Sequence, residues 1–221
     1  MQKLDYIIVG LGIAGLSFCE NLIKNNKRFV VFDSGKSTST LVSAGVINPV
    51  VLKRFTPVWN ANLHIPLAID FYKELSLKLK TSFFKEIPML RIFKNVAEQN
   101  DWIVASDKIE LSSFLQPDII KNKNPNIIAP FGLGKVENTA RINTSDLIVS
   151  YKKYLLKKNL FIEEIFKYES LQETNDAIIY SGFQAKKIVF SEGASVLHNP
   201  FFPPSPPSGG KHLLIPNKGE Y

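Results

Sequence analysis

The chain has 221 residues, of which 45% are hydrophobic and 21% charged, and this composition is typical of one globular domain with or without an insertion. No apolar run reaches the ~20 residues of a membrane-spanning helix, and the apolar N-terminal stretch lacks the cleavage site of a signal peptide, so no membrane partner is expected. The single cysteine excludes an internal disulfide and favours a cytoplasmic location, and the net charge of +7 comes from dispersed lysines, so nucleic acid is not an expected partner.

The chain opens with a predicted strand–helix–strand unit. Leu4–Val9 is an apolar, β-branched run of strand length, Ile13–Lys24 has its apolar residues at helical spacing, and Arg28–Asp33 is predicted to be a second buried strand. Such a βαβ unit places its two strands parallel in one sheet with a right-handed crossover. The sequence therefore predicts an α/β fold that starts as a Rossmann-like domain with a parallel sheet.

The turn between the first strand and the helix carries the spacing G-x-G-x-x-G at Gly10, Gly12 and Gly15. In a dinucleotide-binding unit the first glycine makes the tight turn, the second lets the backbone approach a pyrophosphate, and the third lets the helix pack closely on the sheet. The helix N-terminus adds free N–H groups and a partial positive charge. The pattern predicts dinucleotide binding, and the alternative is a glycine-rich turn that serves packing alone.

A carboxylate that binds a ribose diol is expected about 20 residues after the glycines, at the end of the second strand. Asp33 occupies that position. The alternative for Asp33 is an ordinary turn residue at a strand end. The βαβ unit by itself does not distinguish FAD from NAD.

The middle of the chain changes character. Residues 37–50 are predicted to form a loop of small residues, and His64–Lys80 has helical spacing. From residue 82 to about 128, strand-like runs within 83–93 precede a helix within 95–106 and then turns between short strands. We interpret this part as an inserted α+β subdomain, and we expect Trp59 and Trp102 to be core or subdomain contacts rather than stacking platforms.

The last third is predicted to hold one amphipathic helix over 142–159, with Asn143 or Thr144 as its N-cap. Strand-like runs follow at Leu160–Phe166, Ala177–Tyr180 and Lys186–Phe190. The tail from residue 199 is rich in Pro, Ser and Gly, and its large apolar residues are expected to be mostly buried, within the chain or at a contact between copies in a homo-oligomer. These residues are Phe201, Phe202, Leu213, Leu214 and Ile215.

Three segments follow the glycine turn in the same order as in a known family: VFDSGKSTSTLVSAGVINP (31–49), NLFIEEIF (159–166) and KKIVFSEGAS (186–195). Together with the glycine turn, they resemble the D-amino-acid oxidase and glycine oxidase family of FAD-dependent oxidoreductases. The resemblance covers roughly residues 4–60 and 140–195. It implies an FAD-binding domain of residues 1–80 and 135–200, with a partial substrate-type subdomain of residues 81–134 and 201–221.

The resemblance implies that FAD is the cofactor and that the substrate is a small molecule, an amino acid or related amine, oxidised by hydride transfer to flavin N5. The glycines would face the pyrophosphate, Asp33 the adenosine ribose, and the backbone at Ile165 or Phe166 the adenine. The implied FAD contacts are Gly10, Gly12, Ile13, Ala14, Gly15, Asp33, Ser34, Ser39, Thr40, Ser43, Ala44, Gly45, Val46, Ile165, Phe166, Ser191, Glu192 and Gly193. Of these, Ser39 and Thr40 would face the phosphates or ribityl chain, Ala44 to Val46 the isoalloxazine, and Ser191 with Gly193 would close over the nucleotide. No catalytic residue is assigned and no metal is predicted.

The sequence departs from the family at several points. Asp33 stands where the family usually has Glu, and Ser191-Glu192-Gly193 replaces Ala-Thr-Gly or Ala-Ala-Gly. Family members are considerably longer, so we expect the chain to be truncated at its C-terminus. Two alternatives therefore stand beside the oxidoreductase: a truncated nucleotide-binding remnant without activity, and an NAD-dependent dehydrogenase.

Overall fold

The computed structural model describes residues 1–35, 39–174 and 177–202. The chain divides into two compact units, the first made of residues 1–39 and 158–221 and the second of residues 40–157. This division differs from the predicted boundaries, since residues 40–80 and 135–157 belong with the predicted insertion. The reason is packing within the second unit, where helix α2 (Ala61–Leu79) contacts helix α4 (Thr144–Lys157) and strand β6 (Phe84–Glu86).

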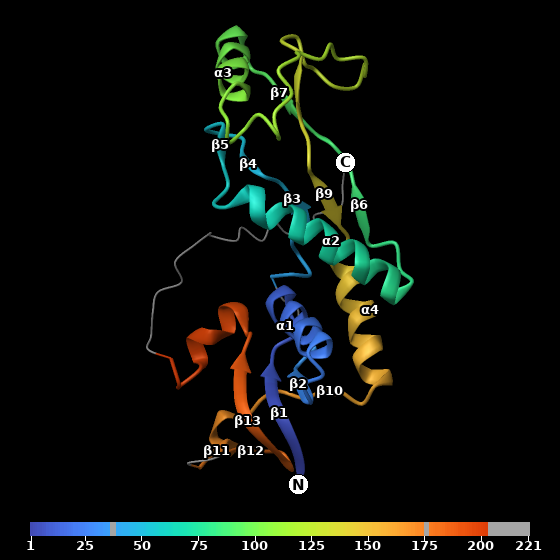
Figure 1. The fold of residues 1–221 in the computed structure, drawn as a ribbon, viewed down its shortest axis with the longest axis vertical. Coiled ribbons are helices and arrows are strands. Elements are labelled where there is room, and N and C mark those ends of the chain that lie inside the picture. The colour runs from blue at the N-terminus through green and yellow to red at the C-terminus, as the bar shows by residue number, and fades with distance from the viewer. Residues whose placement is uncertain (36–38, 175–176, 203–221) are drawn as a thin grey trace, which may run out of the picture. The chain divides into compact units, whose positions relative to one another are not determined.

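The first unit is built on one six-stranded sheet (Figure 1). Four neighbouring strands are parallel, and two further strands extend the sheet as an antiparallel meander. Across the sheet the order is β10 (Phe161–Glu163), β2 (Phe29–Asp33), β1 (Gln2–Val9), β13 (Phe183–Phe190), β12 (Ile178–Tyr180) and β11 (Gln172–Glu173). The connection between β1 and β2 is helix α1 (Ile13–Lys24), which has the predicted bounds.

The core of this unit lies on both faces of the parallel strands, as their near-continuous apolar sequences require. Ile7 and Ile8 of β1 are both fully buried, although they point to opposite faces of the sheet. Helix α1 adds Leu16 and Cys19, and burial raises the pKa of the Cys19 thiol. Glu20, predicted to be at a polar position of this helix, is also buried.

Asp5 of β1 connects this strand with β13 and with the residue that precedes β2. Its Oδ2 accepts a hydrogen bond from the Arg28 backbone N–H at 3.0 Å, and Lys186 Nζ lies 3.0 Å from its Oδ1. The Arg28 hydrogen bond, followed by the Lys186 interaction, lowers the pKa of Asp5 below the ordinary 3.8. The charged carboxylate therefore stabilises the fold at neutral pH.

Asp5→Asn should lower the free energy of unfolding modestly at pH 7. Because the folded-state pKa is depressed, this contribution is complete above the ordinary pKa of 3.8 and is lost as pH falls through the lower folded value. Urea unfolding of both proteins between pH 7 and pH 2 measures the difference, which should shrink only below about pH 4. The exposed Asp118→Asn is the control, and a pH-independent difference for Asp5→Asn contradicts the prediction.

The second unit contains three helices and three small antiparallel sheets within its described residues. Its helices are α2 (Ala61–Leu79), α3 (Val96–Ser106) and α4 (Thr144–Lys157). Its sheets are β3 (Val46–Ile47) and β6 (Phe84–Glu86) on either side of β9 (Ala140–Ile142), β4 (Val50–Val51) with β5 (Thr56–Pro57), and β7 (Met89–Ile92) with β8 (Leu133–Val136). The predicted loop over 37–50, of which residues 37 and 38 lie outside the described residues, is wrong in part. Strand β3 forms there by pairing with β9, and β4, which pairs with β5, begins at Val50.

Trp102 is the centre of the second unit's core. It is fully buried, and its ring meets the rings of Phe55 and Phe93 edge-on at centroid distances of 5.4 and 5.5 Å. Its Nε1–H donates to the Gln116 carbonyl at 2.7 Å. The expectation for Trp59 is wrong, because its side chain is 77% exposed.

None of the helices among the described residues is both long and apolar enough to cross a membrane.

Of the apolar tail residues that were expected to be buried, only Phe201 and Phe202 lie among the described residues. Phe201 and Phe202 are 50% and 47% exposed, so the chain itself does not bury them as predicted. Both rings contact Phe190 at the end of β13, at centroid distances of 5.7 and 6.0 Å. Leu213, Leu214 and Ile215 lie outside the described residues.

Candidate nucleotide site

The glycine turn follows directly from β1. Gly10 has a φ of +99°, a conformation that side chains disfavour, and its N–H donates to the Phe32 carbonyl of β2 at 2.9 Å. A Cβ at Gly10 would lie 2.5 Å from the Ser191 carbonyl oxygen, just after β13. The first glycine is therefore needed both for the turn and for the approach of a second backbone segment.

Gly15 sits inside the first turn of α1. A Cβ there would lie 2.2 Å from the carbonyl oxygen of Gly10 and 3.4 Å from Cβ of Ser191. Because the first of these neighbours is backbone, no side-chain rotation would relieve the overlap. Gly15 thus has the close-packing role predicted for the third glycine, toward the turn that leaves β1.

The N-terminus of α1 has the properties of an anion site. Gly12 is its N-cap, with φ −77° and ψ −173°, and makes no side-chain capping bond. The first N–H groups of a helix have no partner inside that helix, and the helix dipole favours negative charge beside them. No acidic residue lies in this first turn, Ala14 is exposed, and Ile13 is half-buried. A phosphate is the kind of group that such a helix end binds.

Asp33 lies at the end of β2, next to the glycine turn. Its Oδ2 accepts a hydrogen bond from the Leu11 N–H at 2.7 Å, and its Oδ1 accepts one from the Gly35 N–H at 2.7 Å. A carboxylate oxygen can accept two hydrogen bonds, so each oxygen keeps capacity for a further donor such as a ribose hydroxyl. The sequence pattern did not single out Leu11, although any residue between the two glycines supplies this N–H. Ser34, the next residue after Asp33, is exposed.

The predicted third segment forms the other side of the turn. The Ser191 N–H donates to the Val9 carbonyl at 2.7 Å, which continues the parallel pairing of β1 with β13. The Glu192 carboxylate accepts hydrogen bonds from Tyr168 and Asn199, and Gly193 has a φ of +58°. The structure therefore brings Ser191 and the backbone of Glu192 to the glycine turn, and the implied closure of these residues over a nucleotide stays a prediction.

The predicted adenine segment follows β10. Phe166 is buried and stacks on Tyr180, with the ring centroids 4.1 Å apart, whereas Ile165 is 57% exposed. The Tyr180 hydroxyl accepts a hydrogen bond from the Lys167 N–H at 3.0 Å, and burial raises the pKa of this phenol. Phe166 is thus part of the core through its ring, and the implied contact of its backbone with an adenine stays a prediction.

The remaining predicted residues belong to the second unit, except Ser39, which ends the first part of the first unit. Thr40 and Ser43 form a turn in which the Ser43 hydroxyl donates to the Thr40 carbonyl at 2.9 Å. Ala44 is exposed, and Gly45 has a φ of +63° and faces the Ile142 carbonyl, which a Cβ would meet at 1.9 Å. Val46, at the start of β3, is exposed. Within the second unit, Gly45 has a packing role, because a Cβ there would overlap the Ile142 carbonyl.

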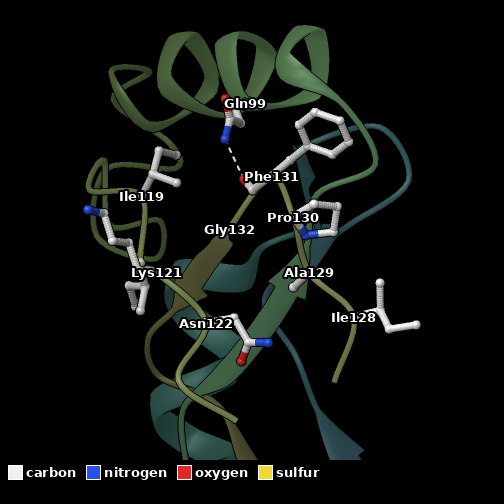
Figure 2. Close-up of a pocket in the computed structure, with 10 residues that line it drawn as sticks. Gln99, Ile119, Lys121, Asn122, Ile128, Ala129, Pro130, Phe131 and Gly132 are labelled. Carbon is white, nitrogen blue, oxygen red and sulfur yellow. Dashed lines mark hydrogen bonds between the residues drawn. The ribbon is translucent and has the colours of Figure 1, made fainter. Parts of the chain in front are cut away.

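The second unit also has a surface hollow of about 740 Å³ that the sequence did not indicate (Figure 2). Its lining consists of Gln99, Ile119, Ile120, Lys121, Asn122, Ile128, Ala129, Pro130, Phe131 and Gly132. The Gln99 side chain donates to the Phe131 carbonyl, so its amide holds the wall of the hollow together. None of the predicted cofactor contacts lines this hollow.

No protein-family model matches the chain. Among solved structures, the glycine oxidase from Geobacillus kaustophilus matches with a TM-score of 0.65 at 16% sequence identity, covering 86% of this chain and 55% of that one. The iminodiacetate oxidase from Chelativorans sp. BNC1 matches with a TM-score of 0.61 at 16% identity, covering 87% and 56%. The L-amino acid deaminase from Proteus myxofaciens, solved in complex with anthranilate, has a TM-score of 0.63 at 12% identity, covering 86% and 45%.

The fold is therefore that of the amino-acid oxidases and deaminases, which confirms the predicted α/β class and the predicted resemblance. The chain spans about half the length of these proteins. At such sequence identities the match concerns the backbone fold, and fold alone does not define a substrate.

Proposed function

We propose that this chain binds FAD and belongs to an oxidoreductase that acts on an amino acid or a related amine. The glycine turn carries the proposal: Gly10 and Gly15 allow backbone segments to pack where a Cβ would overlap them, and Gly12, which has no side chain, is the N-cap of α1. Asp33 is held beside this turn by the Leu11 N–H. These features fit the pyrophosphate and ribose of a dinucleotide.

In this proposal each part of the first unit has a separate task. The N–H groups around Gly12 bind the pyrophosphate, and the carboxylate of Asp33 accepts hydrogen bonds from the ribose. The backbone at Phe166 approaches the adenine. When bound, the flavin would supply the hydride acceptor, and the protein contributes binding, orientation and electrostatics.

The substrate class rests on likeness to the oxidases and deaminases, whose names refer to amino acids and iminodiacetate. A small amine or amino acid is therefore the proposed partner, with neither nucleic acid nor membrane, in the cytoplasm. Association into a homo-oligomer would cover the half-exposed rings of Phe201 and Phe202.

One experiment tests cofactor and chemistry together. The purified chain is titrated with FAD and, separately, with NAD, and the FAD complex is then mixed anaerobically with glycine, D- and L-amino acids, N-methylglycine and iminodiacetate. We expect FAD to bind and its visible absorbance to bleach with at least one of these compounds. FAD binding without bleaching overturns the catalytic part and favours a nucleotide-binding protein without turnover. Binding of NAD alone favours a dehydrogenase.

Asp33→Ala should weaken FAD binding by about 10- to 100-fold, because hydrogen bonds to a charged group contribute about 1.5–3 kcal/mol. The dissociation constant is measured by quenching of flavin fluorescence, and circular dichroism reports whether the turn stays folded. The matched control is Asp101→Ala, which removes an exposed carboxylate on α3. An unchanged dissociation constant for Asp33→Ala contradicts the proposed ribose contact.

A further inference from the structure

A group of three hydrogen-bonded side chains lies next to the glycine turn. The Tyr168 hydroxyl donates to Oε1 of Glu192, and Asn199 Nδ2 donates to Oε2 of Glu192 at 2.7 Å. Asn199 is only 3% exposed, and its own Oδ1 accepts a hydrogen bond from the Phe201 N–H at 2.9 Å. Both oxygens of the carboxylate are therefore held by donors from two other segments of the chain.

The backbone of Glu192 touches the glycine turn. A Cβ built on Gly10 would lie 3.3 Å from Cα of Glu192 and 2.5 Å from the carbonyl oxygen of Ser191. The Ser191 N–H is bonded to the Val9 carbonyl on the other side. Hydrogen bonds that hold the Glu192 side chain in place therefore also hold the backbone of Ser191 and Glu192 against the turn that precedes α1.

The charge of Glu192 needs an explanation at this position. A carboxylate near a site for anionic phosphates opposes their binding unless hydrogen-bond donors compensate it. Tyr168 and Asn199 supply two such donors. Burial, and then the hydrogen bond to Glu192, raise the pKa of Tyr168, so the phenol stays protonated and remains a donor at neutral pH.

We propose that Glu192 is a positioning residue for a pyrophosphate-containing nucleotide: through Tyr168 and Asn199 it holds Ser191 and its own backbone against Gly10, and the two donors compensate its negative charge. This inference rests on the proposed FAD binding. It adds Tyr168 and Asn199, which the nucleotide need not touch, and gives Glu192 a positioning role in place of the direct contact that the resemblance implied. It also explains how Glu is accommodated at a position where the sequence resemblance leads one to expect Ala or Thr.

The test uses the full chain with FAD and, as a smaller pyrophosphate probe, ADP. Glu192→Ala should weaken binding of both ligands by about tenfold. Glu192→Gln keeps the acceptor for Tyr168 and loses only the acceptor for Asn199, so it should stay within about threefold of the unchanged protein. Tyr168→Phe leaves the carboxylate with one donor and should weaken binding by about tenfold. The double variant Tyr168→Phe/Glu192→Gln should regain most of that loss, because the undercompensated charge is gone.

Restoration by the second substitution separates a charge effect from a general loss of structure. Glu169→Ala, an exposed carboxylate beside Tyr168, is the control and should bind normally. If the unchanged protein binds neither FAD nor ADP, the proposed function fails. If it binds both and folded Glu192→Ala binds equally well, the positioning role alone is overturned. Should Glu192→Ala not fold, the comparison of Tyr168→Phe with the double variant decides, and absence of recovery overturns the inference.

Discussion

Replacing Gly12 by valine is expected to abolish FAD retention while the chain remains folded. The backbone of Gly12, at φ −77° and ψ −173°, is one that any residue adopts, so valine introduces no backbone strain. As an N-cap, valine is poorer than glycine, which costs the helix up to about 1 kcal/mol. Its branched side chain, however, would project at the helix end where the phosphates must approach closely. We expect a loss of at least about 100-fold in affinity, or about 2.7 kcal/mol.

The measurement is the flavin content of the purified variant, followed by titration with FAD. Ala97→Val is a suitable control, because it also adds a branched side chain to the first turn of a helix, at an exposed position of α3. Circular dichroism and thermal unfolding show whether both variants are folded. A folded Gly12→Val protein with an unchanged dissociation constant would place the nucleotide elsewhere.

Trp102→Ala should have the largest effect on stability. Removing a fully buried aromatic side chain leaves a cavity and costs about 3–5 kcal/mol. The Gln116 carbonyl would also lose the donor that now lies 2.7 Å away. Because proteins are stabilised by only about 5–15 kcal/mol in total, we expect the second unit to unfold at much lower urea concentrations.

Trp59→Ala is the natural comparison, since it makes the same substitution at a tryptophan that is 77% exposed. Its effect should stay within about 0.5 kcal/mol. Urea titrations followed by tryptophan fluorescence would be ambiguous, because each variant lacks one of the two tryptophans. Far-UV circular dichroism is therefore the appropriate signal. Equal stability of the two variants would contradict the assignment of Trp102 to the core.

The N-terminal part of the first unit was predictable, because its apolar periodicity and its glycine spacing are local features of the sequence. Helix α1 has the predicted bounds, while β1 begins at Gln2 rather than Leu4 and β2 at Phe29 rather than Arg28. Each of these elements is long enough to show its own periodicity. The glycines are equally local, because each serves a backbone geometry within a few residues of itself.

The boundary between the units was not predictable in the same way. Strand β3 has two residues and pairs with β9, almost one hundred positions later in the chain, as Val46 opposite Arg141 shows. A two-residue strand has no periodicity, so its pairing depends on the partner and not on its own sequence. Likewise, α2 has an amphipathic pattern, but the pattern does not specify that α4 and β6 are its neighbours.

By itself, the sequence determined the class of fold, the bounds of α1 and the glycine turn with an acidic residue at the end of the second strand. Local backbone preferences and side-chain periodicity suffice for these features. Only the tertiary structure decided that Leu11 donates to Asp33, that Tyr168 and Asn199 hold Glu192, and that one tryptophan is buried while the other is exposed. These outcomes depend on segments distant in the sequence meeting at hydrogen-bond distance, and no pattern within a single segment encodes that meeting.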